Sequence, residues 1–76
     1  MKIELLGTGC SKCVQLETVV QQAITISGKL VTLEKVDDIM KIIQYQVLTT
    51  PGLVVDGKVV STGKVLSVDE VLAYIN

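Results

Sequence analysis

Two cysteines, Cys10 and Cys13, are separated by two residues in the segment Gly7-Thr8-Gly9-Cys10-Ser11-Lys12-Cys13. The segment directly follows a short apolar run and directly precedes a helical pattern, so the pair is expected at the N-terminal end of a helix. The unpaired backbone N–H groups and the helix dipole at such an end favour a thiolate over a thiol. A cysteine in this setting is reactive. The spacing therefore predicts a working dithiol.

Thiol–disulfide exchange needs one exposed thiolate that attacks and a second thiol that resolves the mixed disulfide. Cys10, at the loop end of the motif, is the candidate nucleophile, and Cys13, inside the first helical turn, is the candidate resolving thiol. Lys12 adds a positive charge that is expected to lower the pKa of Cys10 together with the helix N-terminus. The alternative is that both cysteines are small core residues, since free Cys is often buried. Their joint placement in one Gly-flanked loop argues against that alternative.

The elements that would position this dithiol begin with a strand over Lys2–Leu6, which ends at the glycines of the motif. Polar residues recur at helical spacing from residue 13 to residue 27, and Gly28 fits a left-handed C-terminal cap. The inner face of this helix is expected to carry Leu16, Val20, Ala23, Ile24 and Ser27.

The second half of the chain predicts four more elements. They are an edge strand over Leu30–Val36, a helix from Asp38 to about Gln46 capped by Asp37 or Asp38, a hairpin pairing Leu53–Val55 with Lys58–Val60, and a last helix after Ser67. Asp56-Gly57 suits the type I′ turn of a hairpin, and Ser67 with Glu70 forms a capping box. In the second helix we expect Ile39, Ile42 and Ile43 to recur on one face, with Met40 and Tyr45 covering the inner side. Tyr74 is expected at the surface.

The element order is thus β-α-β-α-β-β-α. A helix between two strands gives a right-handed parallel crossover, and the later hairpin adds two antiparallel strands. Seventy-six residues suffice for one small domain. We therefore expect an α/β fold in a single domain over residues 1–76, with a mixed four-stranded sheet and three helices.

Composition excludes several classes of function. A net charge of -1 with no basic cluster gives no electrostatic footprint for nucleic acid. No apolar run approaches the roughly 18 to 20 residues that cross a bilayer, and no signal-peptide core is present, so a cytoplasmic protein without membrane association is expected. In a reducing compartment, a disulfide that closes so small a loop is a poor structural staple, which again favours a chemical use of the cysteines.

The cysteine motif, together with Thr50-Pro51-Gly52-Leu53-Val54-Val55-Asp56-Gly57-Lys58, resembles the thioredoxin and glutaredoxin superfamily. More narrowly it looks like the minimal bacterial and archaeal thioredoxin-like proteins called redox-active disulfide proteins, over the full length. The resemblance implies a thioredoxin-like fold and a thiol–disulfide oxidoreductase. It also implies that Pro51 is cis and packs beside the disulfide, while Thr50 offers backbone groups to a substrate strand. For Pro51, the alternative is a simple turn breaker before an edge strand.

The chain departs from thioredoxins proper, which usually carry Trp before the first cysteine and Gly-Pro between the two. Gly9 stands at the first place, and Ser11-Lys12 at the second. Glu4 lies six residues before Cys10, a spacing comparable to thioredoxin's buried acidic residue, and could then be a proton acceptor for Cys13. We favour the alternative, a solvated residue on a half-exposed strand, because Glu is seldom fully buried. Gly63 is a candidate contact for a peptide or glutathione, as in the corresponding region of glutaredoxins. A plain loop glycine is the stronger alternative.

The resemblance implies substrates that carry a disulfide, either a protein or a small thiol compound, and a donor of the thioredoxin-reductase kind. We expect no cofactor, no resident metal and a monomer. The alternative from another class is a soft-metal carrier, since paired thiolates suit copper(I). Copper-chaperone-like domains differ in element order and would leave Thr50-Pro51 without a role. A structural zinc site would need four ligands, and an interaction module without turnover is a third possibility.

Overall fold

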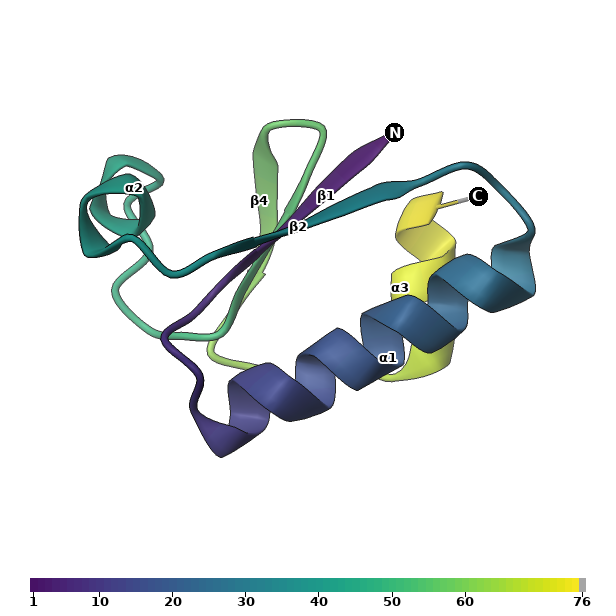
Figure 1. Cartoon of the computed structure of the whole chain (residues 1–76), viewed down its shortest axis with the longest axis horizontal. Coiled ribbons are helices and arrows are strands. Elements are labelled where there is room, and N and C mark those ends of the chain that lie inside the picture. The colour runs from purple at the N-terminus through teal and green to yellow at the C-terminus, as the bar shows by residue number, and fades with distance from the viewer. Residues whose placement is uncertain (76) are drawn as a thin grey trace.

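The computed structural model describes residues 1–75 and contains seven elements (Figure 1). They are β1 (Lys2–Leu6), α1 (Ser11–Ser27), β2 (Thr32–Val36), α2 (Ile39–Gln44), β3 (Gly52–Val55), β4 (Lys58–Thr62) and α3 (Val68–Ile75). The order β-α-β-α-β-β-α is the one predicted, and the main differences are at the ends of the elements.

The four strands form one mixed sheet in the order β2-β1-β3-β4. β1 runs parallel to β2 and antiparallel to β3, and β3 runs antiparallel to β4. β1 is therefore a central strand, whereas β2 lies at an edge as expected. Asp56 and Gly57 join β3 to β4 with φ values of 50° and 83°, which are the positive angles of a type I′ turn. The predicted α/β thioredoxin-like architecture is confirmed.

One face of the sheet is covered by α1 and α3, which lie side by side in Figure 1. Alternate residues of a strand point to opposite faces, and Ile3 and Leu5 of β1 point toward this helical pair. The main core consists of Ile3, Leu5, Leu16, Val20, Ala23, Leu53, Leu66, Val71 and Ile75. The predicted inner face of the first helix is confirmed at its three buried members, Leu16, Val20 and Ala23.

The opposite face of the sheet holds a smaller core under α2. Ile42 packs there with Leu6, Val36, Val47 and Val54. The prediction was wrong for Ile39, Met40 and Ile43, which are 62%, 66% and 55% exposed, whereas Tyr45 packs against this core as expected. This helix has only six residues and buries a single side chain, Ile42, against the sheet. Helical spacing alone therefore predicts too many buried residues for it.

Each helix begins at a side chain that accepts a backbone hydrogen bond or that forms a capping box. Asp38 caps α2 by accepting from the backbone N–H of Met40 at 2.9 Å. Ser67 and Glu70 exchange two hydrogen bonds of 3.2 Å at the start of α3, which confirms the capping box. At the C-terminal end of α1, Gly28 has the predicted left-handed conformation, with φ 67°.

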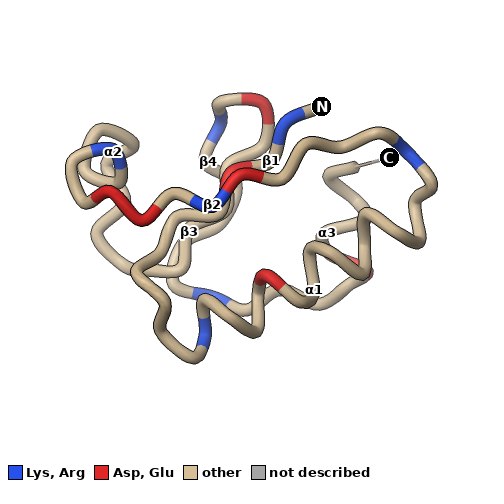
Figure 2. The backbone as a smooth tube through the Cα atoms, viewed as in Figure 1, with Lys and Arg blue, Asp and Glu red and all other residues tan. Residues whose placement is uncertain are grey.

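Figure 2 shows acidic and basic positions interspersed along the backbone. Over residues 1–75, no helix combines the length and the apolar character that crossing a membrane requires.

Candidate active site

Strand register brings three separate segments to one end of the sheet. Leu6 at the end of β1 pairs with Gly52 at the start of β3, and Gly52 pairs with Thr62 at the end of β4. The next residue outward in each segment is Gly7, Pro51 and Gly63, respectively. The loop before α1 and the segment before β3 accordingly lie at the same end of the sheet in Figure 1. The sequence motif and the Thr-Pro segment, about forty residues apart in the chain, are neighbours in the fold.

Cys10 is the N-cap residue of α1, and its sulfur accepts a hydrogen bond from the backbone N–H of Cys13 at 3.2 Å. The helix therefore begins at Ser11, two residues before the predicted start. Cys10 is exposed to solvent, whereas Cys13 is buried and only 5% exposed. The two free thiols are close together but differ in their access to solvent.

The environment of Cys10 favours its thiolate. A hydrogen bond from the Cys13 thiol is the main cause that lowers the pKa of Cys10, and the backbone N–H of Cys13 contributes next. Lys12, which is exposed, contributes to the lower pKa through its backbone N–H. The predicted direction is confirmed, but the groups responsible are the donors at the helix start, where unpaired N–H groups converge on the cap.

The environment of Cys13 favours its protonated form. Burial is the main cause that raises the pKa of Cys13, and its side-chain hydrogen bond to Cys10 acts in the same direction. A negative charge on Cys10 raises it further. The pair therefore consists of an exposed sulfur that loses its proton easily and a buried sulfur that keeps it, which is the division of properties that sequential thiol–disulfide exchange requires.

The Thr-Pro segment has the backbone geometry that the resemblance implied. The Thr50–Pro51 peptide bond is cis, Pro51 is fully buried and Thr50 is half-buried. The carbonyl oxygen of Pro51 accepts a hydrogen bond of 2.8 Å from the N–H of Gly63. Gly63 has φ 69°, and a Cβ there would lie 2.7 Å from the Thr49 side chain. The positive φ and the nearness of the Thr49 side chain therefore explain glycine at position 63 without any contact with substrate.

A groove of about 410 Å³ runs alongside the Cys13 thiol. Its walls include Gly7, Thr8 and Cys13 near the dithiol, and Glu17 and Lys35 farther out. The Lys35 ammonium and the Glu17 carboxylate form an ion pair of 3.0 Å across α1 and β2. The buried cysteine consequently borders an open depression at the surface of the protein, with both apolar and polar walls.

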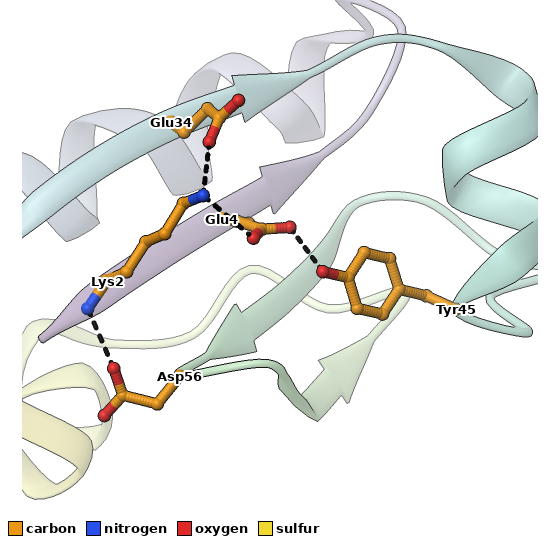
Figure 3. A network of polar contacts seen from close by, with 5 residues as sticks. All are labelled: Lys2, Glu4, Glu34, Tyr45 and Asp56. Carbon is orange, nitrogen blue, oxygen red and sulfur yellow. Dashed lines mark hydrogen bonds and ion pairs between the residues drawn. The ribbon is translucent and has the colours of Figure 1, made fainter.

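Glu4 lies on the other face of the sheet from Cys13. Its neighbours Ile3 and Leu5 point toward α1, so Glu4 points toward α2, and its carboxylate accepts a hydrogen bond of 2.7 Å from the Tyr45 hydroxyl. Figure 3 shows this contact within a network that also includes Lys2, Glu34 and Asp56. The expectation of a solvated residue was incomplete, since only 13% of the Glu4 side chain is exposed. The idea of a proton acceptor for Cys13 was wrong, because the sheet separates the two groups.

Within residues 1–75, no group of three or more His, Cys, Asp or Glu side chains is arranged to hold a metal ion. The dithiol is the chemically distinctive feature of this end of the sheet.

Two comparisons with known proteins agree with this fold. The model of the thioredoxin domain matches residues 1–76. A thioredoxin from Methanothermobacter thermautotrophicus is 36% identical over 58 residues, which cover 76% of this chain and 75% of that protein. The chain belongs to the thioredoxin-domain family, as a small thioredoxin-like protein.

Sequence reasoning identified both cysteines and the Thr-Pro segment but missed two features of the structure. One is the Glu4–Tyr45 contact, which joins residues 41 positions apart and has no local signal. The other is the space at Gly7, which was interpreted only as part of a turn. A Cβ at this position would come within 2.5 Å of the Cys13 sulfur.

Proposed function

We propose that this protein is a thiol–disulfide oxidoreductase in which Cys10 is the nucleophile and Cys13 the resolving thiol. The observation that carries the proposal is the placement of the two sulfurs: Cys10 is exposed at the N-cap of α1, where it accepts a hydrogen bond of 3.2 Å from the backbone N–H of Cys13, and the Cys13 side chain is buried beside it. The pKa, lowered at Cys10 and raised at Cys13, agrees with this division. Membership of the thioredoxin family supports the same reaction type.

The reaction proceeds in two balanced steps. The Cys10 thiolate attacks one sulfur of a substrate disulfide, forms a mixed disulfide and releases the other substrate sulfur as a thiolate. Cys13 then loses its proton to solvent and attacks the Cys10 sulfur. This second step forms the Cys10–Cys13 disulfide and releases the remaining substrate thiolate, so two electrons have moved from the protein to the substrate.

Substrate contacts are proposed at the end of the sheet where the dithiol lies. The half-buried Thr50, next to Pro51, supplies backbone groups to an extended disulfide-bearing segment, and Gly63 lies beside it through its hydrogen bond to Pro51. Lys12, exposed in the first turn of α1, is available to an acidic group on the partner. A disulfide-containing protein or a small disulfide is the proposed substrate class, and a reductase of the thioredoxin-reductase kind is the proposed donor.

Reaction with glutathione disulfide, followed by mass spectrometry of the intact protein, tests this proposal. The reduced wild-type protein is expected to end as an internal disulfide without attached glutathione. Cys13→Ser should stop as a stable mixed disulfide on Cys10, and Cys10→Ser should remain essentially unmodified. The proposal fails if Cys10→Ser reacts as fast as the wild type. A protein that stays reduced in this assay but retains copper(I) through both thiols would instead favour the soft-metal carrier.

A further inference from the structure

Gly7, the residue that follows β1, lies directly against the Cys13 side chain. A Cβ built on Gly7 would lie 2.5 Å from the Cys13 sulfur and 3.2 Å from its Cβ. Ordinary van der Waals contact for such a Cβ begins at about 3.4 Å, so the sulfur and a methyl group at this position would have to separate by about 1 Å. The place of the buried thiol thus depends on the absence of a side chain at residue 7.

Backbone conformation does not explain this glycine. Gly7 does not have the positive φ that favours glycine. Gly9 is the opposite case, because its φ is 87° and a Cβ added there would have no atom within 4 Å. The N–H of Gly7 donates a hydrogen bond of 3.0 Å to the carbonyl oxygen of Val36, which any residue except proline could do. Space for the sulfur is therefore the property that distinguishes glycine from alanine here.

We infer that Gly7 is a positioning residue for the resolving step, because it leaves the space in which the Cys13 sulfur approaches Cys10. The inference rests on the proposed function, in which Cys13 attacks the mixed disulfide at Cys10. Gly7 also lines the groove beside Cys13, so a methyl group would narrow the route by which the thiol proton reaches solvent. Both effects act on Cys13, whereas the exposed Cys10 sulfur lies outside the contact.

A dithiobis(nitrobenzoate) reaction separates the two steps, because each releases one coloured nitrothiobenzoate. Attack by the Cys10 thiolate releases the first and leaves a mixed disulfide on Cys10. The Cys13 thiol then gives its proton to solvent and displaces the second, forming the internal disulfide. The second phase is unimolecular, so its rate is independent of reagent concentration, and Cys13→Ala should lack it altogether.

For Gly7→Ala we expect the first phase to keep its wild-type rate when both proteins are compared at an alkaline pH at which Cys10 is fully ionised. A weaker hydrogen bond from the displaced Cys13 thiol then leaves the thiolate fraction of Cys10 unchanged. The second phase should slow by roughly 10- to 100-fold, since a displacement of about 1 Å in a reacting group has effects of this size. Gly28→Ala is the matched control, because it makes the same change at a positive φ with no atom within 4 Å of the new Cβ, far along α1 from the dithiol. It should lower the thermal midpoint and leave both phases unchanged.

Equal slowing of both phases in Gly7→Ala, or no slowing of the second, would overturn the inference while leaving the proposed function intact. A wild-type protein without a second phase would overturn both. If Gly7→Ala does not fold, the double variant Gly7→Ala/Cys13→Ala decides, because it removes the sulfur. If the double variant folds, the clash was with the Cys13 sulfur, and the inference is supported. If neither variant folds, the clash lies elsewhere and the inference is refuted.

Discussion

The backbone N–H of Cys13 donates a hydrogen bond to the sulfur of Cys10 across 3.2 Å. This contact makes the first cysteine the cap of the helix that buries the second. One short segment thereby gives two identical side chains opposite properties: the exposed sulfur gains hydrogen-bond donors, and the buried sulfur loses solvent. The asymmetry follows from the position of the motif at a helix start and from the packing of α1 on the sheet.

The first prediction concerns the pH dependence of Cys10. The rate of alkylation by iodoacetamide follows the thiolate fraction, so its midpoint at Cys10 should lie below that of an ordinary cysteine, because hydrogen bonds lower the pKa of Cys10. Cys13→Ala removes the first of these causes, the Cys13 thiol, and should raise the midpoint. Lys12→Gln keeps the backbone N–H through which Lys12 acts and should change it less. A midpoint that Cys13→Ala leaves in place would contradict the assigned cause.

The second prediction concerns the network around Glu4. Tyr45→Phe removes the donor of the 2.7 Å hydrogen bond to the Glu4 carboxylate. Since a half-buried carboxylate loses a partner, the free energy of unfolding measured in urea should fall. The matched control is Tyr74→Phe, which changes a tyrosine that is 41% exposed and should have a smaller effect. The rate of internal disulfide formation should remain at the wild-type value in both variants, because Glu4 and Tyr45 lie across the sheet from Cys13. A slower resolving step in Tyr45→Phe would contradict this placement.

The third prediction concerns the cap of α3. Ser67→Ala removes the hydroxyl that accepts from the backbone N–H of Glu70, and loss of such a cap costs about 1 kcal/mol of stability. Thermal and urea unfolding would measure it. Thr18→Ala is the control, because Thr18 is an exposed position inside α1 where alanine is at least as good a helix former. Equal losses for the two variants would show that the capping box does not stabilise α3.

The elements with local signals were predicted well from the sequence. Helix ends with their own chemistry, such as Gly28 and the pair Ser67 and Glu70, are determined within a few residues of chain. The same holds for the Asp56-Gly57 turn, where both residues adopt the positive φ that the turn needs. These local features determine the element order, and with it the fold class.

Features that depend on packing between distant segments were not predictable in the same way. The spacing of Glu4 relative to Cys10 suggested a common site, but strand alternation sends its side chain to the opposite face. Helical spacing placed Ile39 and Ile43 in the core, although α2 covers too little of the sheet to bury them. The need for glycine at position 7 comes from the Cys13 sulfur, which belongs to α1. It can be recognised only from the packing of α1 against the end of β1.

The redox equilibrium of Cys10 and Cys13 tests the central claim most directly. The protein would be equilibrated in metal-free dithiothreitol buffers of defined potential, and its free thiols would be counted by alkylation and mass. We expect a single two-electron transition to an internal disulfide within roughly -300 to -180 mV, the span of working dithiols. If no internal disulfide forms anywhere in that range, the dithiol is not a redox couple and the proposed function is wrong.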